Sequence, residues 1–63
     1  MKNIKYEGTV GSHVFQMVDD NTIEIWGSND LEFPEGYIYL KEGDVKDEKS
    51  FQQEISFWFL QNS

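Results

Sequence analysis

The sequence predicts a small α+β domain: a four-stranded antiparallel sheet, connected as a meander, with one C-terminal helix packed on one face. Two patterns indicate this fold. The first two thirds of the chain alternate apolar and polar residues in short runs between turn-forming residues, as half-buried strands do. The last part repeats apolar residues at helical spacings. At 63 residues, the chain has room for one domain, spanning residues 1–63.

The first two predicted strands, residues 3–10 and 13–18, form a hairpin around Gly11-Ser12. Glycine at the first of two loop residues suits a type II′ turn. A two-residue loop places Val10 opposite His13, and opposed residues share a face of the sheet. The apolar face predicted by this register contains Ile4, Tyr6, Val10, Phe15 and Met17.

The third predicted strand, residues 22–26, could follow a loop of two or three residues. A two-residue loop would turn Ile23 and Ile25 away from the apolar face. A three-residue loop, residues 19–21, would turn them onto it. We choose three, because this register gathers the apolar side chains on one side. Asn21 also tolerates the left-handed backbone conformation that such loops need.

Residues 37–41 are predicted as the fourth strand, with Ile38 and Leu40 facing the helix. The loop before it is rich in turn-forming residues. In that loop we expect Leu31 and Phe33 to fold back against the domain as apolar plugs.

The C-terminal helix is predicted from an apolar stripe about 100° wide. Its start could be capped by Asp47, or by Ser50 with Gln53 in a capping box. An acidic first turn also suits the helix dipole. The stripe contains Phe51, Ile55, Trp58 and Phe59.

Two groups of apolar residues are left over by these patterns. On the helix, Phe57 and Leu60 lie on the side opposite the stripe. On the sheet, the side chains facing away from the helix include Val14, Val18, Trp26, Tyr37 and Tyr39. Small monomers rarely expose so much contiguous apolar surface without a use. We interpret one group as the interface of a homodimer or a docking surface; alternatively, a folded-back loop covers the helix and the aromatics are ordinary strand formers.

The charge restricts the partners. Twelve Asp and Glu against five Lys give a formal net charge of −7. Nucleic acids and anionic membranes require clustered cations, so we expect neither as a partner. No run reaches the roughly 18 apolar residues of a membrane span. A basic protein is permitted electrostatically. The densest acidic side chains are Glu42, Asp44, Asp47 and Glu48.

Candidate chemistry is sparse. His13 is the single imidazole, its spacing to serines and acids predicts no catalytic triad, and we expect it to be a solvated turn residue. There is no Cys, and the acidic segment lacks the spacing of an EF-hand loop. We therefore expect no enzyme activity, cofactor or metal site.

The sequence thus predicts a small acidic interaction module that forms a homodimer. One alternative is an acidic inhibitor that mimics a polyanion for a basic protein. A second is a small-ligand binder that uses the aromatic sheet face. No signal peptide is visible, so we expect a cytoplasmic location.

Overall fold

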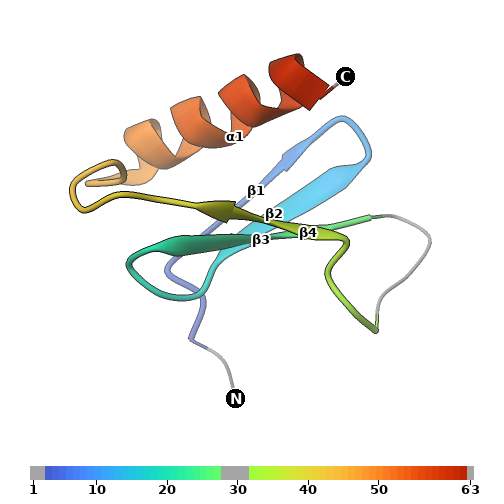
Figure 1. The fold of residues 1–63 in the computed structure, drawn as a ribbon, viewed down its shortest axis with the longest axis horizontal. Coiled ribbons are helices and arrows are strands. Elements are labelled where there is room, and N and C mark those ends of the chain that lie inside the picture. Colours follow the sequence, from blue (N-terminus) through green and yellow to red (C-terminus); the bar gives the residue numbers. More distant parts are fainter. Residues whose placement is uncertain (1–2, 28–31, 63) are drawn as a thin grey trace.

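The computed structural model describes residues 3–27 and 32–62. This part of the chain forms, in order, β1 (Tyr6–Val10), β2 (His13–Met17), β3 (Thr22–Trp26), β4 (Gly36–Tyr39) and α1 (Glu48–Asn62). The strands form one antiparallel sheet in the order β1-β2-β3-β4, and α1 lies across one side of it (Figure 1). The predicted α+β meander with a C-terminal helix is confirmed.

The hairpin of β1 and β2 has the predicted register, with Val10 opposite His13. A type II′ turn requires a positive φ at its first loop residue only. Gly11 has a φ of 61°, and the φ of Ser12 is not positive. A Cβ atom at Gly11 would also lie 2.8 Å from the ring of Phe59. Glycine is therefore needed there for both the turn and the approach of α1.

The start of β1 differs from the prediction. The register continues to Lys5, whose backbone N–H donates to the carbonyl of Met17 at 2.8 Å. One residue earlier, Ile4 would stand opposite Asp19, which already belongs to the next turn. Ile4 is 46% exposed, so its assignment to the core is wrong: the hairpin ends before it.

The loop between β2 and β3 has the predicted length, because Met17 pairs with Ile23. The left-handed conformation predicted for Asn21 is wrong, since within residues 3–27 and 32–62 only glycines have a positive φ. Instead, the Asn21 backbone N–H donates to Asp19 Oδ1 at 2.8 Å. An Asx turn shapes this loop.

The fourth strand starts one residue earlier and ends two residues earlier than predicted. Leu40 follows β4, buries its side chain in the core and donates its backbone N–H to the carbonyl of Asn21 at 2.7 Å. In the loop before β4, Phe33 is 67% exposed, so its predicted folding back is wrong. Leu31, the other expected plug, lies outside the described residues.

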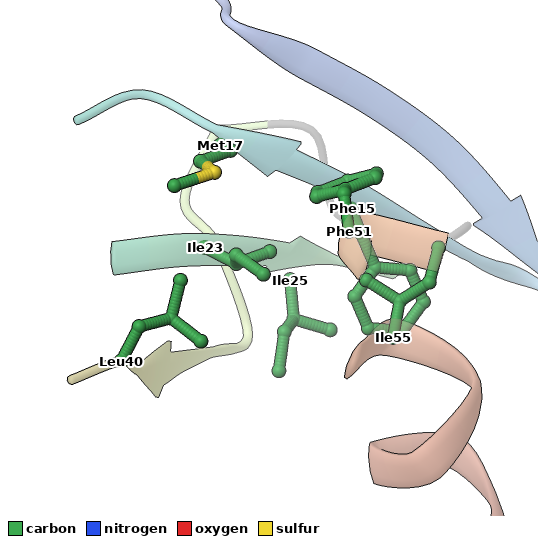
Figure 2. Packing of buried hydrophobic residues seen from close by; sticks show 7 residues of the cluster. All are labelled: Phe15, Met17, Ile23, Ile25, Leu40, Phe51 and Ile55. Atoms are coloured by element: carbon green, nitrogen blue, oxygen red, sulfur yellow. The ribbon is translucent and has the colours of Figure 1, made fainter. Parts of the chain in front are cut away.

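The core lies between α1 and the inner face of the sheet, and Figure 2 shows its side chains converging there. The helix contributes Phe51 and Ile55, and its contact with the sheet is chiefly with β1. At Gly8 the approach is close: a Cβ atom would lie 2.8 Å from Gln52 Nε2 and 3.0 Å from Ile55 Cδ1. The buried set is Phe15, Met17, Ile23, Ile25, Leu40, Phe51 and Ile55.

Asp47 caps the helix. Its Oδ1 accepts the backbone N–H of Ser50 at 2.9 Å, and Ser50 Oγ accepts the backbone N–H of Asp47 at 3.0 Å. This reciprocal pair is a capping box with aspartate in the first position. The first helical hydrogen bond runs from Phe51 N–H to the Asp47 carbonyl at 3.1 Å. Of the two predicted caps, Asp47 is therefore the one used, and Ser50 lies inside the helix.

Candidate functional site

The first candidate surface is the side of the sheet turned away from α1, here called the outer sheet face. Cross-strand pairs place Trp26 opposite Val14 and Glu24 opposite Tyr37, and Tyr39 stands opposite Thr22. The alternation beyond β2 puts Val18 on the same face. The structure therefore brings together the predicted sheet residues. Its strand residues are Glu7, Thr9, Val14, Gln16, Thr22, Glu24, Trp26, Tyr37 and Tyr39, and Val18 follows just beyond β2.

A polar row crosses the middle of this face. The pairing runs from Glu7 through Gln16 and Glu24 to Tyr37. Gln16 Nε2 donates to Glu7 Oε2 at 2.6 Å, and Trp26 Nε1 donates to Glu24 Oε1 at 3.3 Å. Glu24 is only 5% exposed, so this row holds a carboxylate that is nearly buried beneath the surface.

Tyr37 is the last residue of that row, and Trp26 and Tyr39 lie on either side of the row. The rings of Tyr37 and Tyr39 stack, with centroids 6.1 Å apart and planes inclined at 27°. Tyr39 is 79% exposed, and Tyr37 and Trp26 are partly exposed. A shallow hollow of about 300 Å³ lies next to the Trp26 ring, lined also by Val14, Gln16 and Gly27. The outer sheet face is therefore both aromatic and hollowed.

Sequence reasoning missed Glu24. The run Ile23-Glu24-Ile25 alternates apolar and polar residues, and alternation alone does not distinguish an enclosed carboxylate from an exposed one. The register, however, fixes its neighbours as Gln16 on one side and Tyr37 on the other. The register of the strands is therefore the signal that shows the carboxylate of Glu24 lying between an amide and an aromatic ring.

The second candidate surface is the side of α1 turned away from the sheet, here called the helix far face. Phe57 is 58% exposed and Leu60 is 74% exposed, as the helical spacing predicted. Phe57, Leu60 and neighbouring polar side chains line a shallow hollow of about 440 Å³. None of its lining residues is acidic. They are Lys49, Gln52, Gln53, Ser56, Phe57 and Leu60.

The two surfaces do not meet. The helix far face and the outer sheet face lie on opposite sides of the molecule, with the core between them (Figure 1). A partner bound to one therefore leaves the other accessible.

The predicted acidic residues are all exposed, but two of the four have local structural partners. Asp44 Oδ2 accepts the backbone N–H of Lys41 at 2.9 Å and shapes the turn after β4. Asp47 caps α1, and the hydrogen bonds that it accepts from the backbone N–H and hydroxyl of Ser50 lower the pKa of Asp47 below its ordinary value of 3.8. Glu42 and Glu48 lie beside these turns.

His13 is not the solvated residue that its turn position suggested. Its ring meets the rings of Phe15, Trp58 and Phe59 edge-on, at centroid distances of 5.8–6.3 Å. Nδ1 lies 2.8 Å from Glu35 Oε1 but makes no hydrogen bond. His13 faces the helix side of the hairpin end, so the closing of α1 over that end partly buries it.

No protein-family model matches the chain, and neither the curated proteins nor the solved structures give a significant match. Within the described ranges, no three His, Asp or Glu side chains converge as metal ligands. No helix in that part of the chain is long and apolar enough to span a membrane.

Proposed function

We propose that this protein is a non-catalytic interaction module that self-associates as a homodimer through the helix far face. The observation that carries the proposal is the exposure of Phe57 and Leu60 on neighbouring turns of α1. Each exposes apolar surface to water in the monomer, and a second copy of the same surface would cover both. In a twofold interface each of these residues contributes apolar surface from both chains.

The charge pattern supports a second copy as the occupant. Two chains that each carry −7 repel one another, so a self-contact is favoured where acidic side chains are absent. The helix far face meets this condition, because its lining is two apolar residues, three uncharged polar residues and Lys49. Of the acids of the helix, Glu48 lies at a helical angle within the core stripe, and Glu54 lies between the stripe and Phe57.

The outer sheet face is less suited to self-contact. Two copies packed face to face would bring Glu7 and Glu24 of one chain toward the same carboxylates of the other. Like charges brought together at an interface oppose association. The helix far face is therefore the better supported dimer interface.

The expected dimer is weak. A standard interface buries about 800 Å² per partner, whereas the whole monomer exposes 4640 Å². One face of a 15-residue helix, about 22 Å long, supplies less than that share. Interfaces below this size belong to transient complexes, so we expect a Kd in the micromolar range or above.

Dilution followed by ¹H–¹⁵N NMR tests this proposal. From millimolar to micromolar concentration, the amide signals around Ser56, Phe57 and Leu60 should shift, and those of β3 and β4 should stay in place. Shifts confined to the outer sheet face would contradict the proposed seam, and unchanged spectra would contradict self-association.

The acidic-inhibitor alternative has less support. A polyanion mimic needs its carboxylates free to meet a basic partner. Asp44 and Asp47 instead accept hydrogen bonds from neighbouring backbone groups. The acidic segment is thus explained in large part by the turn and the cap that it forms.

A further inference from the structure

We propose a second binding site, independent of self-association: the outer sheet face binds an arginine side chain in a basic segment of a partner protein. The site consists of the rings of Trp26, Tyr37 and Tyr39 together with the carboxylate of Glu24. A guanidinium group would lie against the exposed aromatic rings, beside the hollow that Trp26 shares with Val14 and Gln16.

The aromatic rings supply the first half of the recognition. Ring faces attract cations through their quadrupoles, and the effect grows where water is excluded. Tyr37 and Tyr39 stack at 6.1 Å. Tyr37 stands opposite Glu24, and Trp26 lies two residues after Glu24 on the same face of β3. Arginine fits this surface better than lysine, because its planar group stacks on rings and is more weakly hydrated.

Glu24 supplies the second half. It is 5% exposed, and its Oε1 lies 3.3 Å from the indole nitrogen of Trp26. A negative charge so close to the rings is screened less than one in open water. It therefore makes the potential over the ring surface more negative and favours a cation there.

The balance of charge on this face points the same way. The polar row contains the carboxylates of Glu7 and Glu24, and Glu7 is joined to Gln16. At the opposite end of the face from the Gly11-Ser12 turn, next to the loop between β2 and β3, Lys5 forms an ion pair with Asp20, so its charge is offset locally. The summed charge of these described residues is therefore negative, and a basic partner supplies the complement.

Titration with short peptides tests this site in the wild-type protein. The probes are an uncapped peptide of alternating arginine and glycine, the same peptide with citrulline in place of arginine, and a single-stranded oligothymidine. The readouts are the indole N–H signal of Trp26 and the ring signals of Tyr37 and Tyr39. We expect the arginine peptide to shift these signals, and the neutral citrulline peptide and the oligonucleotide to leave them unchanged.

Two variants of equal charge separate a local site from general attraction. Glu24→Gln should weaken arginine-peptide binding about tenfold, because it removes the charge beside the rings. Glu42→Gln removes the same charge from an exposed turn and should weaken binding less than about twofold. If Glu24→Gln fails to fold, Tyr39→Ser replaces it, since Tyr39 is 79% exposed; it should weaken binding about fivefold.

Four results would overturn the inference. They are no shift with the arginine peptide up to millimolar concentration, equal binding of the citrulline peptide, equal losses for Glu24→Gln and Glu42→Gln, and a response to the oligonucleotide alone. None depends on dimerisation, so this site and the proposed homodimer are tested separately.

Discussion

Phe15 and Phe57 offer a matched comparison at the scale of single residues. Phe15 is fully buried and meets the Trp58 ring edge-on at 5.6 Å, whereas Phe57 is 58% exposed. Truncating a buried phenylalanine costs about 3–5 kcal/mol. A domain of this size has about that much stability in total.

Phe15→Ala should therefore be largely unfolded without denaturant, and Phe57→Ala should stay folded. Circular dichroism and urea unfolding measure both. A Phe15→Ala variant with an unchanged urea midpoint would contradict the strand register that buries this residue.

Asp47 predicts an acid dependence of stability. Hydrogen bonds from the Ser50 backbone and hydroxyl lower the pKa of Asp47 in the folded protein. The ionised carboxylate therefore stabilises the fold at pH values above 3.8, and this contribution is lost as the pH falls through the lower folded-state pKa.

Asp47→Asn keeps a capping oxygen and removes the titration. Relative to this variant, the wild type should lose stability as the pH drops from about 6 to about 2.5. Urea midpoints at both pH values measure the change. A difference between the two proteins that stays constant with pH would show that the cap does not titrate as proposed.

At the scale of elements, Gly8 sets the distance between β1 and α1. An added Cβ atom would lie 2.8 Å from Gln52 Nε2 and 3.0 Å from Ile55 Cδ1. The Gln52 amide can swing aside, but Ile55 is packed in the core. Overpacking of this kind costs about 1–3 kcal/mol.

We expect Gly8→Ala to lower the free energy of unfolding by that amount. Gly36→Ala is the control, because its Cβ would meet Ile25 Cδ1 at an ordinary 3.6 Å. Urea unfolding compares the two. Equal losses in both variants would mean that the cost comes from the strands themselves and not from the helix contact.

The elements were predictable where one local rule decided them. The length of the Gly11-Ser12 turn fixed the first register, and the stripe through Phe51 and Ile55 fixed the buried side of the helix. The ends of β1 and β4 were not predictable, because they depend on how far the neighbouring strand continues. Ile4 fits the alternation but has no partner residue in a strand opposite it.

The site was predictable in part for the same reason. Alternation placed Trp26, Tyr37 and Tyr39 on one face, and helical spacing placed Phe57 and Leu60 on another. The enclosure of Glu24 and the partial burial of His13 were missed. Both depend on side chains from several elements meeting, and no single run of sequence shows such a meeting.

At the scale of the whole molecule, one helix covers one side of the sheet. The outer sheet face and the helix far face both stay exposed. A compact protein of 7.4 kDa exposes roughly 4,200 Å², and this one exposes 4640 Å². Association at the helix far face would also add stability with concentration, which a small core benefits from.

Solution mass measured over a concentration series tests the central claim, self-association through the helix far face, most directly. By sedimentation, the wild type should rise from 7.4 kDa at micromolar concentration toward twice that value at millimolar concentration. Leu60→Asp should remain a monomer throughout, and Asn3→Asp, which adds the same charge at an exposed position outside the helix, should follow the wild type. A wild-type chain that stays at 7.4 kDa at millimolar concentration would contradict the account.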